Sequence, residues 1–335
     1  MIPELIVEIG NTHEGSVGIA KSFVDLIKAS GAKIAKFQMH LAEFESSPQD
    51  TFRVKFSDQD DSRIEYWNRI NFNDNLWSTL SAYCDSQQIE FMCTPFSIEA
   101  AEKLMRLTSI ERWKVGSGDA VNFPLLDFLI ETEKPLIIST GLVTWEEILI
   151  LKKRLMSKGA WTRTTLMHCV SEYPTSLEHV SLHIIDELKS LGCRVGLSDH
   201  SGNISTALCA ITKGIDLLEI HVKPVANFFG PDNSSSILPE DIEFLVNFIS
   251  DFEIINSTKY TRNELFDFAS STARLFRKGV YARENLQKGK LIEPGDLAYL
   301  KPADGIDSIH FEKILGKKLV KDIKKHDKLG FDDFE

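Results

Sequence analysis

The sequence predicts an α/β protein: an eight-stranded (β/α)₈ barrel followed by a small β-rich domain. First, short apolar runs with strand character alternate with segments of helical spacing, eight times over. Second, the chain has 335 residues and 43% hydrophobic content, which suits one barrel-sized domain plus an appendage. Third, the C-terminal part consists of short runs punctuated by Gly and Pro.

The elements can be placed one after another along the chain. The predicted strands are Leu5–Ile9, Ile34–Gln38, Glu90–Thr94, Trp113–Ser117, Leu136–Thr140, Thr165–Cys169, Val195–Asp199 and Leu217–Val222. Segments with helical spacing follow them in turn: Val17–Ser30, Asn75–Gln87, Ile98–Leu107, Pro124–Glu131, Trp145–Lys158, Leu182–Leu191, Asn203–Lys213 and Pro239–Phe252. We therefore expect a barrel over residues 1–256, a linker over 257–273 and a small domain over 274–335.

Composition excludes several kinds of partner. The formal net charge is −11, whereas nucleic acids and anionic membranes require a basic face. No apolar stretch approaches the roughly 20 residues that cross a bilayer. The five cysteines are odd in number, lie in apolar segments and form no C-x-x-C. They are typical of a reducing compartment, so a cytoplasmic location is expected.

Two histidines end neighbouring predicted strands. His200 directly follows the seventh strand, and His221 is the second-last residue of the eighth. The active site of such a barrel lies at the carboxyl ends of its strands, where two imidazoles can hold one divalent metal. Each could instead be a structural, hydrogen-bonded histidine. The ring of polar residues that ends the other strands favours the metal.

Two lysines lie inside strands between apolar neighbours. Lys36 follows Ala35, and Lys114 follows Trp113. A lysine that faces the barrel interior is costly to bury unless it meets an anion, so we expect a phosphate or carboxylate site here. The alternative is that both side chains extend outward between the helices.

Motifs in order along about the first 235 residues carry a family resemblance. They are Glu8-Ile9-Gly10 with His13-Glu14-Gly15, Lys36-Phe37-Gln38, Thr94-Pro95-Phe96, Lys114-Val115-Gly116-Ser117-Gly118, Ser139-Thr140-Gly141, Tyr173-Pro174, Gly196-Leu197-Ser198-Asp199-His200 and Gly230-Pro231-Asp232. This ordered set resembles the sialic acid synthases, which make nine-carbon sugar acids from phosphoenolpyruvate. Residues 274–335 resemble the antifreeze-like (SAF, β-clip) domain that ends these enzymes.

The resemblance implies a reaction and a role for each residue. Phosphoenolpyruvate would condense with an N-acylated amino-sugar aldehyde, N-acetylmannosamine or a bacterial deoxy diamino analogue, and phosphate would be released. Glu8 would handle protons, while His200 and His221 would bind a divalent metal, Mn²⁺ or alternatively Mg²⁺ or Co²⁺. The residues expected to bind phosphoenolpyruvate are Lys36, Thr94, Lys114, Ser117, Ser139 and Ser198. Those expected to bind the sugar are Gln38, Phe96, Asp119, Tyr173, Asp232 and Lys301.

The resemblance also implies a domain-swapped homodimer, in which the tail lends a basic residue to the partner's barrel. Here the chain departs from the family, because Lys301-Pro302-Ala303 stands where Arg-Pro-Gly is usual. Lysine offers a point charge without a bidentate fork. The alternative functions are a metal-dependent barrel aldolase, a synthase of another 3-deoxy-2-keto acid, and a non-catalytic carbohydrate-binding relative.

Overall fold

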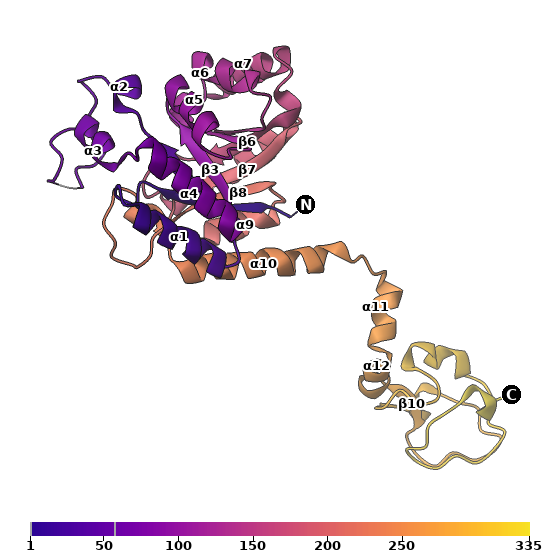
Figure 1. Ribbon diagram of the computed structural model, residues 1–335. Helices are drawn as coiled ribbons and strands as arrows, with labels where there is room; N and C mark the ends of the chain where they lie inside the picture. The colour runs from indigo at the N-terminus through magenta and orange to yellow at the C-terminus, as the bar shows by residue number, and fades with distance from the viewer. Residues whose placement is uncertain (1, 57) are drawn as a thin grey trace. The chain divides into compact units, whose positions relative to one another are not determined.

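The computed structural model describes residues 2–56 and 58–335, and the chain forms two compact units, Met1–Ser257 and Thr258–Glu335. The first unit is a barrel of parallel strands with helices outside it (Figure 1). Its strands are β1 Glu4–Gly10, β2 Ile34–Met39, β3 Glu90–Pro95, β4 Trp113–Val115, β5 Leu136–Ser139, β6 Thr164–Cys169, β7 Arg194–Asp199 and β8 Leu217–Val222. The strands pair in the order β3-β2-β1-β8-β7-β6-β5-β4, and β3 also lies beside β4. The predicted eight-stranded barrel is confirmed.

Helices cover the outside of the strands. They are α1 Val17–Ala29, α4 Asp74–Gln87, α5 Ile98–Leu107, α6 Phe123–Glu131, α7 Trp145–Ser157, α8 His183–Ser190, α9 Ile204–Thr212 and α10 Pro239–Ser257. Polar side chains begin several of them, as where Ser16 accepts from the backbone of Ile19 and Thr144 forms a capping box with Glu147. None of the helices in the described part of the chain is long and apolar enough to span a membrane.

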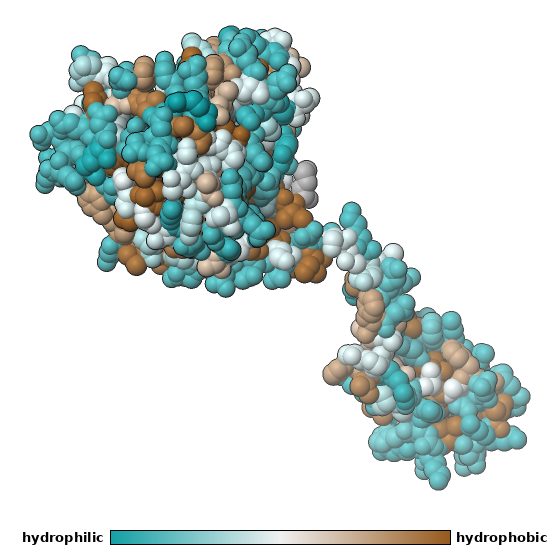
Figure 2. Space-filling view, in the orientation of Figure 1, coloured by the Kyte–Doolittle hydropathy of each residue, from teal (hydrophilic) through white to brown (hydrophobic). Residues whose placement is uncertain are grey.

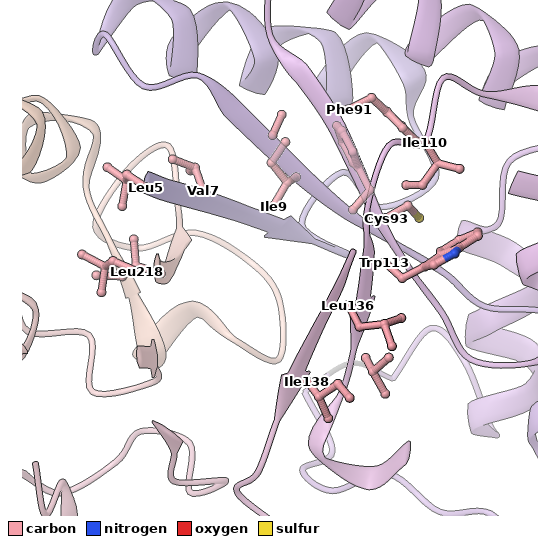
Figure 3. Close-up of a cluster of buried hydrophobic side chains, with 14 of the residues drawn as sticks. Leu5, Val7, Ile9, Phe91, Cys93, Ile110, Trp113, Leu136, Ile138 and Leu218 are labelled. Atoms are coloured by element: carbon pink, nitrogen blue, oxygen red, sulfur yellow. The ribbon is translucent and has the colours of Figure 1, made fainter. Parts of the chain in front are cut away.

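Alternation along the strands separates two hydrophobic layers. On β1, Leu5, Val7 and Ile9 pack outward, in the large core shared with the helices (Figure 3). Between them Ile6 belongs to a second cluster inside the barrel, the floor. The floor consists of Ile6, Ile34, Met92, Ile137, Met167 and Leu217. It fits tightly, because a Cβ on Gly196 would meet Met167 and the backbone carbonyl of Leu217.

The next inward-facing residues above the floor are charged or polar. On β1 that residue is Glu8, two positions after Ile6, and on β2 it is Lys36, two positions after Ile34. Both are almost fully buried. Inside the barrel, an apolar layer is therefore followed directly by a charged layer, two residues further along each of these strands.

An insertion after β2 was not predicted as structure. It carries two helices, α2 Ala42–Glu45 and α3 Arg63–Ile70, and its own small hydrophobic cluster around Tyr66 and Trp67. Phe52 and Phe56, which lie between the two helices, pack against this cluster. Aromatic side chains thus supply most of the small core that holds this insertion together.

The second unit contains two helices and a small β fold. Helices α11 Arg262–Phe268 and α12 Ser270–Phe276 precede the antiparallel pair β10 Gly279–Ala282 and β11 Leu297–Leu300. Further bridges and short 3₁₀ turns surround a separate core that includes Val280, Leu297 and Ile314. The β-rich prediction for this region is confirmed.

Most elements differ from the sequence prediction by a residue at one or both ends, and two boundaries differ by more. The fourth strand ends at Val115, because Ser117 already begins a 3₁₀ turn. The predicted linker is largely helical: α10 continues to Ser257, and the capping box of Thr261 and Glu264 begins α11.

Candidate active site

A pocket of about 500 Å³ opens at the carboxyl ends of the barrel strands. Most of the side chains expected to do chemistry line it. They are Glu8, Lys36, Gln38, Thr94, Phe96, Lys114, Ser117, Ser139, Tyr173, Ser198, His200, His221 and Asp232. These residues come from all eight strands or from the loops that follow them. They meet in one pocket because the carboxyl ends of parallel strands lie at the same end of the barrel.

The bottom of this pocket is a charged layer. Lys36 Nζ lies 2.9 Å from Glu8 and 3.4 Å from Glu219, and Lys114 Nζ lies 3.3 Å from Glu219. Both lysines are 3% exposed, which excludes the alternative that they extend outward between the helices. Two buried cations are thus balanced by two buried carboxylates, whereas the sequence interpretation expected the anion to come from a ligand.

Hydroxyl and amide groups complete the layer. Ser198 Oγ donates to Glu219 Oε1 at 3.0 Å, and Lys114 Nζ donates to Ser139 Oγ at 2.9 Å. Gln38 Nε2 donates to Glu8 Oε1 at 2.6 Å. The Thr94 hydroxyl and the second oxygens of Glu8 and Glu219 are buried without a hydrogen-bond partner among the described residues. Such unsatisfied groups indicate a place where a ligand binds.

The backbone of β1 bends directly after Glu8. Gly10 has a φ of 56°, and the register of β1 against β2 shifts between Glu8 and Gly10. A Cβ on Gly10 would lie 3.4 Å from Gln38 Nε2 and 3.6 Å from Glu8 Oε1. Glycine therefore permits the bulge and leaves room for the bond between these two side chains.

The two carboxyl groups have opposite pKa shifts. Burial and the neighbouring Glu219 raise the pKa of Glu8 against the opposing effect of Lys36. Burial also disfavours the charge on Glu219, but Lys114 and Lys36 outweigh it and lower the pKa of Glu219 to about 2. Glu219 is therefore a fixed anion, and Glu8 is the group of the pair that can carry a proton.

His200 and His221 lie side by side above the charged layer, with ring centroids 5.4 Å apart. His200 Nδ1 donates to the carbonyl oxygen of Val170 at 3.0 Å, so Nε2 is the ring nitrogen that remains for a metal. Burial lowers the pKa of His221 to about 4, so its imidazole is neutral near pH 7. Burial disfavours the charge on His200, but Cys169 and the Val170 carbonyl outweigh it and raise the pKa of His200. The pair fits a divalent metal once His200 has given up its proton.

In the described part of the chain, no group of three or more His, Cys, Asp or Glu side chains is placed to hold a metal. A metal on His200 and His221 would therefore keep most of its coordination positions for water and substrate. The arrangement suits a catalytic site with open positions and differs from a closed structural site.

Aromatic side chains line the wider part of the pocket. The ring of Tyr173 lies 4.1 Å from that of His200, so it belongs to the site and is more than part of a turn. Phe96 stacks on His40 at 4.2 Å, and the other face of His40 stacks on Trp67 at 3.6 Å. Phe96 is thus a pocket wall and not a residue of the main core.

Two predicted sugar-binding residues lie elsewhere. Asp119 lines a neighbouring pocket of about 430 Å³ that shares His40, Arg63 and Phe96 with the main one. Asp119 accepts a hydrogen bond from Asn122, and burial raises its pKa. Lys301 belongs to the second unit, where its Nζ lies 5.1 Å from the centre of the Phe276 ring.

Sequence reasoning assigned no role to several residues of the pocket. Glu219 is the most important of them, and its position two residues before His221 placed it on the inward face of β8. Arg53, Phe52 and Phe56 come from the insertion after β2. No local signal in that segment could have indicated that they line the pocket.

Comparisons with known proteins agree with this architecture. The model described as NeuB family matches residues 23–260, and the model described as SAF domain matches residues 277–335. An N,N'-diacetyllegionaminic acid synthase of Campylobacter jejuni is 28% identical, over 96% of this chain and 97% of that protein. An N-acetylneuraminate-9-phosphate synthase of Drosophila melanogaster is 26% identical, over 95% and 92%.

A solved structure shows the same fold. The N-acetylneuraminic acid (sialic acid) synthetase of Leptospira borgpetersenii superposes with a TM-score of 0.68 at 24% identity, over 82% of this chain and 93% of that one. The resemblance seen in the sequence motifs is confirmed by these matches.

Proposed function

The chain belongs to the NeuB family, and we propose that it is a synthase that condenses phosphoenolpyruvate with an N-acylated amino-sugar aldehyde and releases phosphate. The acceptor would be N-acetylmannosamine or a bacterial deoxy diamino analogue. The observation that carries the proposal is the charged layer beneath the histidine pair. Lys114 donates to the Ser139 hydroxyl and Lys36 contacts Glu8 at the bottom of the pocket, where an anion would bind, and His200 and His221 lie side by side in the same pocket.

Phosphoenolpyruvate is proposed to bind at the charged layer. Its phosphate and carboxylate would be held by the two lysines and by the hydroxyls of Thr94, Ser117, Ser139 and Ser198. The Thr94 hydroxyl has no partner within the described residues, so it can donate to such an anion without breaking an existing bond.

The reaction needs one new carbon–carbon bond and the loss of phosphate. C3 of phosphoenolpyruvate attacks the aldehyde carbon, water adds to C2, and the resulting tetrahedral carbon expels inorganic phosphate to leave the ketone. Glu8 is proposed to move the proton at the attacking water or at the new hydroxyl, because its raised pKa lets it carry one. Lys36 and Lys114 would stabilise the developing negative charge.

A divalent metal, Mn²⁺ in our proposal, would be held by His200 and His221. When bound, it supplies Lewis acidity to the aldehyde oxygen. Gln38, Tyr173 and Asp232 are proposed to orient the sugar. Asp119 would contact it only if the sugar also reaches the adjoining pocket.

We also propose a homodimer in a reducing, cytoplasmic location. All five cysteines are free. Ile254 and Ile255 near the end of α10 are 65% and 73% exposed, and Phe268 and Phe276 in the second unit are 69% and 65% exposed. Figure 2 shows hydrophobic atoms at the surface near the end of α10. Large apolar residues on the connecting helices are available for contact with a second copy.

The proposed function is tested by measuring phosphate release from phosphoenolpyruvate with a panel of N-acyl amino sugars. We expect release that requires both an acylated acceptor and phosphoenolpyruvate. Carbon–carbon bond formation from pyruvate without phosphate would instead indicate an aldolase, and binding of sugars without any turnover would indicate a carbohydrate-binding relative.

The trans role of the tail is tested by mixing two inactive proteins, Glu8→Gln with an intact tail and a chain that ends before Arg274. Mixed dimers should recover part of the activity if Lys301 acts on the partner's barrel. Demonstrated mixed dimers without any recovery would rule this role out.

A further inference from the structure

Arg53 lies at the mouth of the pocket and connects the insertion after β2 to the far wall. Its Nη2 donates to Asp232 Oδ1 at 2.8 Å and to the carbonyl oxygen of Pro231 at 3.4 Å. Its guanidinium lies 3.9 Å from the centre of the Tyr173 ring. Phe56 makes a second connection, because its ring lies 5.5 Å from that of Phe229 in the loop after β8.

A chain of neighbouring side chains leads from Arg53 to the histidine pair. The guanidinium packs on Tyr173, Tyr173 packs on His200 at 4.1 Å, and His200 neighbours His221 at 5.4 Å. A sugar whose aldehyde lies at the histidines would pass the edge of the Tyr173 ring, because Arg53 and His200 cover its two faces. Its far substituents would then reach Arg53.

The surroundings of Arg53 combine hydrogen-bond donors with apolar surface. Nη2 makes all of the Arg53 hydrogen bonds to described residues. The N–H groups of Nε and Nη1 therefore remain available to donate to a ligand. Phe52, Val54 and Phe56, which flank it in sequence, also line the pocket. The side chain is 41% exposed, so a ligand can reach it.

We infer that Arg53 is a specificity residue for the acceptor sugar and that it binds the oxygen of the N-acyl group. An acyl group presents one strong acceptor, its carbonyl oxygen, and one apolar methyl. Arg53 supplies the donor and its phenylalanine neighbours supply the apolar wall. This inference rests on the proposed function, because it names the part of the acceptor that the barrel itself recognises.

Arg53 would also compensate for lysine at position 301. If Arg53 already supplies a guanidinium from within the barrel, a bidentate residue from the tail is not required. The basic group that binds the N-acyl group then comes from the same chain as the charged layer and the histidines.

The test measures binding, so that it does not depend on turnover. N-acetylmannosaminitol, the reduced open-chain sugar that cannot react, is titrated into the wild-type protein and into Arg53→Ala, Arg53→Lys and Lys55→Ala. Lys55 is the matched control, because it is a cation of the same segment that is 70% exposed and pairs only with Asp58 among the described residues. Mannitol, which lacks the acyl group, is measured as a competitor, and phosphoenolpyruvate is titrated separately.

Arg53→Ala should weaken binding of N-acetylmannosaminitol by roughly tenfold to hundredfold, as expected for loss of a charge-assisted hydrogen bond. Binding of mannitol and phosphoenolpyruvate should stay nearly unchanged. Arg53→Lys should recover only part of the affinity, because it lacks the fork. Lys55→Ala should bind like the wild type.

Equal losses for N-acetylmannosaminitol and mannitol would overturn the inference, since Arg53 would then only hold the segment in place. Absence of binding by the wild type, or unchanged binding by Arg53→Ala, would overturn it as well. Phosphate release by the wild type is measured beside these titrations. Binding that depends on Arg53 without any phosphate release would sustain this inference and refute the proposed function.

Discussion

The floor of the barrel and the charged layer directly above it are built on the same strands, one pleat apart. In the floor, Ile6 and Leu217 pack against other apolar side chains. Two residues further along the same strands, Glu8 and Glu219 are buried beside Lys36 and Lys114. Identical backbone geometry therefore supports a hydrophobic core below and a site above.

The two layers contribute to folding in opposite ways. Burial of apolar side chains is favourable by roughly 1.5–3 kcal/mol each. A buried ion pair often contributes nothing net, because desolvation cancels its Coulomb attraction, although removal of one partner is strongly destabilising. The comparison teaches that the floor stabilises the barrel, while the charged layer adds little net free energy to folding.

The largest expected effect comes from removal of the divalent metal that we propose on His200 and His221. Chelation should abolish turnover, and added Mn²⁺ should restore it. The apolar floor does not depend on these side chains, so the thermal unfolding temperature should change little. Full activity in metal-stripped protein, checked by elemental analysis, would contradict the proposal.

The next effect concerns Glu8, compared with Glu4 at the other end of the same strand. Glu8→Gln should lower the turnover number by on the order of 10²–10⁴, because amide cannot carry the proton. Glu4 is 44% exposed, pairs with Arg112 and Arg194, and lies away from the pocket. Glu4→Gln should therefore leave turnover unchanged; an equal loss in both variants would mean that β1 is simply sensitive to substitution.

A smaller effect separates the lysines from the floor. Lys36→Ala and Lys114→Ala should each raise the Michaelis constant for phosphoenolpyruvate, by roughly tenfold to hundredfold, well beyond any change for the sugar. Met92→Ala in the floor should cost about 2–5 kcal/mol of unfolding free energy with both Michaelis constants kept. If the lysine variants affect both substrates equally, the lysines support the barrel and do not contact phosphoenolpyruvate.

The smallest effect is the pH dependence of stability. The pKa of Glu219 is lowered from its ordinary value of 4.5 to about 2 in the folded protein. Its contribution to stability is therefore complete above pH 4.5 and is lost as the pH falls towards 2. Urea unfolding across this window should show a steeper loss in the wild type than in Glu219→Gln; parallel curves would show that Glu219 is not the titrating group.

Much of the barrel could be predicted because its signals are local. Alternation of apolar residues and the helix-capping side chains both lie within a few residues of the elements that they define. The charged layer could be predicted in part, since Lys36 and Lys114 are conspicuous between apolar neighbours. Their partner Glu219 could have been found from its spacing to His221, because residues two apart in a strand share a face.

The mouth of the pocket could not be predicted in this way. Arg53 meets Asp232, which lies 179 positions further along the chain. Only the closure of the barrel brings these segments together, and Arg53 lies between α2 and α3, outside any helix or strand. The pairing of Lys114 with Glu219 has the same origin, since it depends on strands that face each other across the barrel.

The charged layer contains as many carboxylates as lysines, and this balance affects how it can bind an anion. An incoming polyanion does not meet two free cations, because Glu8 and Glu219 already balance Lys36 and Lys114. Added negative charge beside Glu8 would raise its already elevated pKa further, which favours the protonated carboxyl group. Association with phosphoenolpyruvate should then become weaker with increasing pH, and its calorimetric enthalpy should vary with the ionisation enthalpy of the buffer.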